Sequence, residues 1–195
     1  MESRFFRRVE SLLFSIPARR ARPASVGFNL LKTLVQSLSM WMVFLLIGPL
    51  VVLRLESLLV GHIWLPSHFS SPFFLAILLF VLGWIIAWTS AWFLVRHGDG
   101  TPLPLDATNK LVVQGPYCWI RNPMAFSSLI QGGAIALAFG SPLILLYVLI
   151  GALLWNFTAR PWEEHDMEER FGDSFRHYRA HVRCWLPRIF PYSPP

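Results

Sequence analysis

Glu163 and Glu164 are two adjacent carboxylates that follow closely on a long stretch without charge. An ionised carboxylate at the edge of an apolar region is costly to leave unpaired, so the pair is expected to have a cationic or hydrogen-bonding partner. Ionised carboxylates also bind cationic groups and accept strong hydrogen bonds from ligand hydroxyls. From these residues alone two interpretations are open: a structural pair or one wall of a binding site.

A second polar segment, residues 98–121, combines conformational restriction with positive charge. Gly115 permits backbone conformations closed to other residues, whereas Pro116 and Pro123 fix φ. Arg121 places a permanent cation immediately before an apolar stretch. The segment predicts a constrained loop, and it fits either a turn with an interfacial belt of tyrosine, tryptophan and arginine or a binding loop.

The segment after Glu164 predicts an amphipathic helix with an apolar stripe and a charged face. Apolar residues at helical spacing are expected to form the packing stripe: Met167, Phe171, Phe175, Tyr178 and Val182. The charged residues between them are expected to form a solvated face: Glu168, Glu169, Arg170 and Arg176.

Neither the histidine and cysteine side chains near the C-terminus nor Cys118 are predicted to be catalytic or metal-binding. His177, His181 and Cys184 lie at positions i, i+4 and i+7, but no fourth ligand is evident, so no metal site is predicted. Cys118 has no identified base and is expected to be a small packing residue.

The elements that position these residues follow from composition. The chain has 195 residues, of which 54% are hydrophobic and only 14% charged. A soluble domain of this size would have about 25% charged residues, so the deficit indicates a lipid-facing protein. Two cysteines cannot build a disulfide framework.

Three uncharged stretches predict the membrane segments. The longest, residues 122–159, would form a helix about 57 Å long, nearly twice the hydrocarbon thickness, so it should fold back at Gly140-Ser141-Pro142. The prediction is an all-α integral membrane protein with about four transmembrane helices and a C-terminal cytoplasmic helical cofactor-binding region. The expected spans are 33–53, which Pro49 should kink, 73–95, 124–139 and 143–158.

Cation placement predicts the orientation. Nearly all Lys and Arg residues lie before the first span, between the second and third, or after the fourth. The positive-inside rule then places both termini, the loop 96–121 and the tail 160–195 in the cytoplasm. Residues 1–32 are expected to be a basic interfacial segment, and 33–195 the membrane domain. The net charge of +6 is thereby explained without a nucleic-acid partner.

The polar motifs occur in a specific order around the predicted hairpin: Gly115-Pro116-Tyr117, Arg121-Asn122-Pro123, Glu163-Glu164, Phe171-Gly172 and Trp185-Leu186-Pro187-Arg188. This arrangement resembles the isoprenylcysteine carboxyl methyltransferases and the related phospholipid methyltransferases. The resemblance implies a membrane-embedded enzyme that uses S-adenosylmethionine without the Rossmann fold of soluble methyltransferases.

The predicted hairpin returns the chain to the same membrane face, so Asn122 and Glu163 should come within one ligand's length although they are 41 positions apart. By motif position, the resemblance implies a composite cofactor pocket there. The implied pocket residues are Lys110, Leu111, Val112, Tyr117, Asn122, Pro123, Met124 and Glu163, with Arg121 and Glu164 as neighbours. No catalytic residue is assigned, because a sulfonium methyl is already activated and mainly needs in-line positioning and exclusion of water.

Three departures from the resembled family concern substrate and pocket. Asn122 stands where His is common, and Ala125 where Tyr is usual. The Arg that binds substrate in the eukaryotic members has no match in register, so substrate identity does not transfer; Arg160 lies one residue from that place and is the candidate contact to the acceptor. We expect a lipophilic or lipidated acceptor that enters from the bilayer: a prenylcysteine-like carboxylate first, a phospholipid amine or thiol second. Two alternatives of other classes are an NADPH-dependent sterol-type reductase and a non-enzymatic membrane scaffold.

Overall fold

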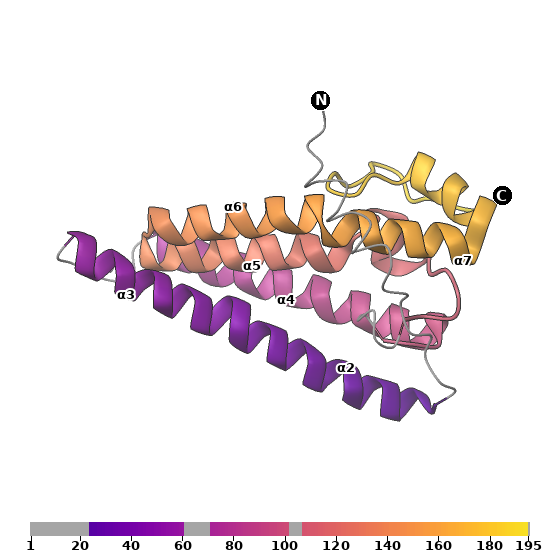
Figure 1. Cartoon of the computed structure of the whole chain (residues 1–195), viewed down its shortest axis with the longest axis horizontal. Coiled ribbons are helices and arrows are strands. Elements are labelled where there is room, and N and C mark those ends of the chain that lie inside the picture. The colour runs from indigo at the N-terminus through magenta and orange to yellow at the C-terminus, as the bar shows by residue number, and fades with distance from the viewer. Residues whose placement is uncertain (1–23, 61–70, 102–106, 195) are drawn as a thin grey trace, which may run out of the picture.

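The computed structural model describes residues 24–60, 71–101 and 107–194, most of which are helical. Most of the predicted basic segment 1–32 lies outside the described residues. Figure 1 shows a bundle in which the start of α2, the end of α4, the start of α5 and the end of α6 lie at one end. We call this the polar end, formed by residues 96–101, 107–123 and 157–194.

The first arm is one continuous helical run: α2 (Val26–Trp41), a π-helical segment η1 (Met42–Ile47) and α3 (Gly48–Val60). The Ser25 side chain caps α2 by accepting from the Phe28 amide at 3.3 Å. The helix therefore begins before the predicted span 33–53, because a single lysine at position 32 does not interrupt it. The distortion expected at Pro49 is found as the π-helical segment immediately before it, and the chain stays helical beyond the proline.

The second arm, α4 (Ser71–Gly98), is longer than the predicted span 73–95 and has Arg96 and His97 in its last turn. Cations are favourable at a helix C-terminus, where backbone carbonyls lack partners. The helix therefore ends among charges rather than at the end of its apolar stretch.

The predicted hairpin is confirmed. Helices α5 (Pro123–Phe139) and α6 (Pro142–Phe157) are separated by Gly140, whose φ of 58° is left-handed and suits glycine. Ser141 then caps α6, since its hydroxyl accepts from the Ile144 amide at 3.1 Å. The turn returns the chain to the polar end.

By length and composition three helices can cross a membrane, Val26–Leu59, Phe73–Gly98 and Pro142–His181, and Pro123–Phe139 is a shorter apolar helix. Large apolar side chains point outward along them, among them Leu50, Phe74, Leu149 and Leu154. The molecule is an all-α membrane protein.

Helix α7 (Ala159–His181) follows α6 at the polar end and carries the predicted packing stripe. Phe175, Tyr178 and Val182 are buried together with Tyr192, and Met167, Phe171 and Cys118 pack against them. The packing role predicted for Cys118 and for the stripe is thus confirmed.

The predicted solvated face of α7 is correct for Glu169 and Arg176, which are exposed, but wrong for Arg170. The Arg170 side chain is only 13% exposed and pairs with Asp166 at 2.6 Å. It also donates to the carbonyl of Thr108. A loop that packs over α7 covers this arginine, which the helical periodicity alone does not reveal. Glu168 is half-buried and pairs with Arg179 at 2.9 Å.

Candidate functional site

A short 3-10 helix, η3 (Gly115–Cys118), anchors the loop that precedes α5. Gly115 has φ of 60°, and a Cβ there would lie 2.6 Å from the Phe93 ring, so only glycine fits. Tyr117 is buried behind it, and its carbonyl accepts the Tyr178 hydroxyl at 2.7 Å. Burial raises the pKa of the Tyr117 hydroxyl, and the Glu163 carboxylate raises it further.

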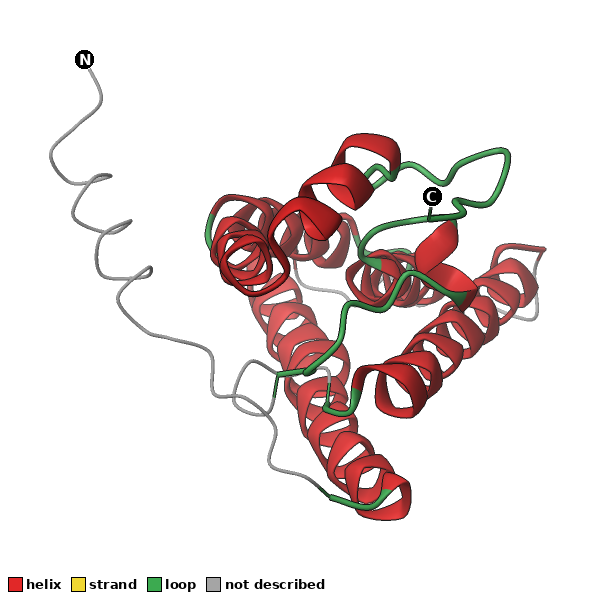
Figure 2. Cartoon of the chain, turned by 90° about the vertical axis from the view of Figure 1, so that its right-hand side faces the viewer, coloured by secondary structure: helices red, strands yellow, loops and turns green. Residues whose placement is uncertain are grey.

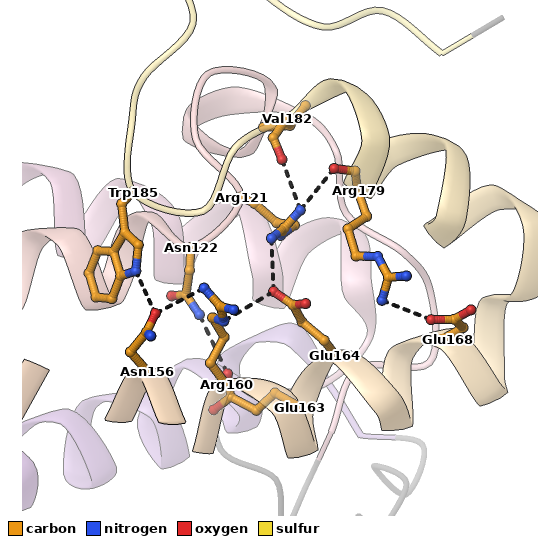
Figure 3. Close-up of polar contacts among 10 residues, drawn as sticks. All are labelled: Arg121, Asn122, Asn156, Arg160, Glu163, Glu164, Glu168, Arg179, Val182 and Trp185. Carbon is orange, nitrogen blue, oxygen red and sulfur yellow. Dashed lines mark hydrogen bonds and ion pairs between the residues drawn. The ribbon is translucent and has the colours of Figure 1, made fainter. Parts of the chain in front are cut away.

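Asn122 connects this loop to α7. Its backbone is non-helical, as expected before a proline, and its side-chain oxygen caps α5 by accepting from the Ala125 amide at 3.1 Å. Its amide nitrogen donates to Oε2 of Glu163 at 3.4 Å. The two residues expected to approach each other across 41 positions are therefore in contact (Figure 3).

Glu163 is an unusual carboxylate. Burial is the largest influence and raises its pKa to about 7, the charge of Glu164 raises it too, and the Asn122 hydrogen bond works in the opposite direction. Among the described residues Asn122 is its one hydrogen-bond partner, and no cation forms an ion pair with it. A buried carboxylate of this kind is complementary to a cationic or hydroxyl-bearing ligand.

Glu164, by contrast, is already paired. It accepts from Arg121 at 2.8 Å, and both side chains are largely buried, 15% and 11% exposed respectively. Arg121 also donates to the backbone carbonyls of Arg179 and Val182, at 2.9 and 3.0 Å. Through these contacts Arg121 fastens the loop to both ends of α7. The sequence had left a structural role for the acidic pair as one of two interpretations, and Glu164 has that role.

Arg160 lies at the junction of α6 and α7 (Figure 3). It donates to the Asn156 side-chain oxygen at 2.9 Å, and its Nε is 3.7 Å from Glu164. The same Asn156 oxygen accepts from the Trp185 indole at 2.9 Å. Sequence reasoning missed Asn156, although a lone amide in an otherwise apolar span was a signal for it.

The remaining predicted residues occupy different places. Pro123 is buried at the start of α5, and Val112 is buried in the loop. Leu111 packs against the core of α7, while Met124 is half-buried. Lys110 is 68% exposed and pairs with Asp99 at 2.6 Å, at the end of α4 rather than with the acidic pair.

Together the contacts make one composite site at the polar end, where Figure 2 shows the loops gathered. It offers a largely buried carboxylate, a buried tyrosine and a permanent cation, but within the described residues no group of three or more metal-ligating side chains. Such a site can bind and orient a charged ligand and exclude water from it.

A family model described as phospholipid methyltransferase matches residues 72–174, which include α4, η3, α5, α6 and the first part of α7. No curated protein matches the chain. The matched region contains Asn122, Glu163 and the other contacts of the composite site, except those made by residues beyond 174.

Proposed function

Because this chain belongs to the phospholipid methyltransferase family and is a membrane methyltransferase, we propose that S-adenosylmethionine is its methyl donor and a lipophilic molecule its acceptor. The observation that carries the proposal is the contact between Asn122 and Glu163, which joins the motif loop to the acidic pair. Neither half of the site is adequate alone.

The residues present fit this cofactor. Glu163 is largely buried without a cationic partner among the described residues, so it complements the ammonium or sulfonium group or accepts from the ribose hydroxyls. The Nε of Arg121 is buried and, in the described part of the chain, lacks a hydrogen-bond partner, so it can donate to a carboxylate. When bound, S-adenosylmethionine supplies an activated methyl group.

The chain's own residues then have positioning roles. Asn122 orients the Glu163 carboxylate, and the Arg121–Glu164 pair holds the loop in place. Burial of Tyr117 and Pro123 keeps water from the inner side of the site. A catalyst for methyl transfer needs mainly this alignment and dryness, because no covalent intermediate is required.

For the acceptor, we propose entry from the bilayer with Arg160 as its anion contact. Arg160 and Asn156 lie where α6 ends, so a lipid-like molecule can reach them sideways. A prenylcysteine-like carboxylate is the first candidate, since a carboxylate nucleophile needs no general base and is attracted by a guanidinium.

A phospholipid amine is the second candidate, and one observation favours it. An ammonium acceptor must lose a proton before it can attack, and a carboxyl group whose pKa is raised to about 7 is a suitable base near neutral pH. A thiol acceptor ranks with the amine.

Titration calorimetry of the purified protein with S-adenosylmethionine and, separately, with NADPH tests the cofactor. We expect binding of the first and none of the second; the opposite result would indicate a reductase, and binding of neither would indicate a scaffold.

Membranes incubated with methyl-labelled S-adenosylmethionine test the acceptor. We expect the label in organic extracts or lipidated protein. Alkaline treatment would release it as volatile methanol from a carboxyl ester but not from a methylated amine. Label confined to water-soluble products would contradict a lipophilic acceptor.

A further inference from the structure

The segment that follows α7, residues 183–192, folds back over the loop of the composite site; we call it the C-terminal strap. Three backbone hydrogen bonds fasten it: Arg121 N to Arg183 O at 2.9 Å, Arg188 N to Trp119 O at 2.8 Å and Tyr192 N to Cys118 O at 2.8 Å. The side chain of Tyr192 is buried in the core of α7 and shares a hydrogen bond with His177 at 2.9 Å. The strap is therefore attached directly to the residues that precede Asn122.

The strap also contacts the membrane-spanning part of the molecule. Trp185 packs edge-on against Trp155, with ring centroids 5.2 Å apart, and donates to Asn156. Both partners belong to the last turns of α6, and in Figure 1 the yellow C-terminal segment runs back to the end of that helix. A helix of 16 residues is about 24 Å long, somewhat less than the hydrocarbon thickness. Arg160, Glu163 and Glu164 follow directly after the end of α6, so this end, and the strap beside it, is expected at the membrane surface.

The side chains that the strap presents are apolar. Leu186, Ile189 and Phe190 are 59%, 85% and 74% exposed, although Cys184 and Tyr192 on either side are buried. The exposed Phe157 at the end of α6 extends the same kind of surface. Water is an unfavourable environment for three large apolar side chains within five residues, whereas a lipid surface is a favourable one.

The positive charges of the strap favour anionic lipid as the partner of this surface. Arg183 is exposed, and Arg188 is held by hydrogen bonds to the carbonyls of Phe190 and His181. Arginine beside tryptophan and aliphatic side chains is the pattern of a segment in the headgroup region of a bilayer that contains anionic lipid.

We propose that the C-terminal strap is a lipid-binding surface. Leu186, Ile189 and Phe190 insert among the lipids, and Arg183 and Arg188 lie at the level of the phosphates. Because the strap is hydrogen-bonded to residues 118–121, lipid contact also holds the loop that carries Asn122. The occupant is the bilayer, neither a second copy of the chain nor a soluble protein.

An environment-sensitive fluorescent amino acid at position 189 tests the insertion directly and leaves both native cysteines in place. The matched control carries it at Asp173, whose side chain is 97% exposed on α7. In nanodiscs that hold one copy each and contain phosphatidylglycerol, we expect the probe at 189 to be quenched several-fold more by spin-labelled lipid than the probe at 173. Iodide in the aqueous phase should quench the probe at 189 several-fold less than the probe at 173. Equal iodide quenching at the two positions would overturn the proposal, as would protection seen only when two copies share a disc.

Hydrogen exchange tests the coupling to the loop. In the double variant Ile189→Ser/Phe190→Ser both changed side chains are exposed, so packing of the bundle should be unaffected. The amides of Arg121, Arg188 and Tyr192 should exchange several-fold faster than in the unchanged protein in the same nanodiscs, while exchange within α4 stays the same. Unchanged exchange at all three amides would show that the strap does not depend on lipid.

Discussion

At the scale of single residues, the two adjacent glutamates have opposite environments. Glu164 is neutralised by Arg121, whereas Glu163 is largely buried, with an amide donor and no ion-pair partner among the described residues. The difference follows from helix geometry, since neighbouring positions on α7 point in directions about 100° apart. A carboxylate kept buried without a cation costs stability, and a cationic ligand would recover that cost.

Glu163→Gln should weaken the binding of S-adenosylmethionine. The change keeps the shape but removes a charge-assisted hydrogen bond worth about 1.5–3 kcal/mol, so the dissociation constant should rise about 10- to 150-fold. Glu169→Gln is the matched control, because that side chain is 68% exposed on the same helix. Titration calorimetry measures both, after thermal melting in one detergent has shown that both are folded. Equal losses would mean that the acidic residues act only as a general electrostatic feature.

The ionisation of Glu163 should also appear in pH profiles. Its pKa rises from 4.5 to about 7 on burial, so the folded state holds the proton more tightly than the unfolded state does. Stability should therefore fall as pH increases from about 4.5 to about 7 and then level off. Affinity for a cationic ligand should increase over the upper part of the same range, because the carboxylate must be ionised.

Melting temperature and cofactor affinity, each measured against pH for the wild type and Glu163→Gln, check this expectation. The fall in stability and the gain in affinity should both be absent from the variant. Identical profiles for the two proteins would contradict the assignment of a perturbed pKa to this residue.

At the scale of elements, the hairpin turn determines where α7 begins. Ser141 caps α6 and also donates to Glu56 of α3 at 2.5 Å, and the Glu56 side chain is buried. One hydroxyl thus joins the first arm to the turn that returns the chain to the polar end.

Ser141→Ala should destabilise the protein by about 2–4 kcal/mol. Loss of the helix cap costs about 1 kcal/mol, and the buried Glu56 loses its hydrogen-bond donor at a cost of about 1–3 kcal/mol. Ser128→Ala is the control, since that serine is exposed within α5 and, among the described residues, its hydroxyl bonds only to the Met124 carbonyl. Denaturant or thermal unfolding in detergent compares them. If the two variants unfolded at the same temperature or denaturant concentration, the stability of the turn would not depend on the Ser141 hydroxyl.

At the scale of the whole molecule, the bundle brings the start of α2, the loop before α5 and α7 to the same end. In the described part of the chain, this end holds every Lys and Arg residue except Arg54. We therefore propose that this end faces the cytoplasm, with residues 1–32 as a basic interfacial segment and 33–195 as the methyltransferase domain.

Reporter fusions at the two termini and an insertion at Ser67, between α3 and α4, test the orientation. Both termini should give cytoplasmic signals, and Ser67 should give a signal from the opposite side. A cytoplasmic signal at Ser67 would contradict the proposed topology.

The sequence by itself determined the membrane class, the four apolar elements and the hairpin, because length, hydropathy and turn residues such as Gly140 act locally. It also predicted that Asn122 and Glu163 would approach each other, since the hairpin returns the chain to its starting side. Tertiary structure alone decided which glutamate is paired, that Arg170 is covered and that Glu56 meets Ser141. It likewise decided that the C-terminal strap pairs with residues 118–121. Each of these depends on side chains from segments distant in the chain, and burial and charge pairing are set by those neighbours rather than by local periodicity.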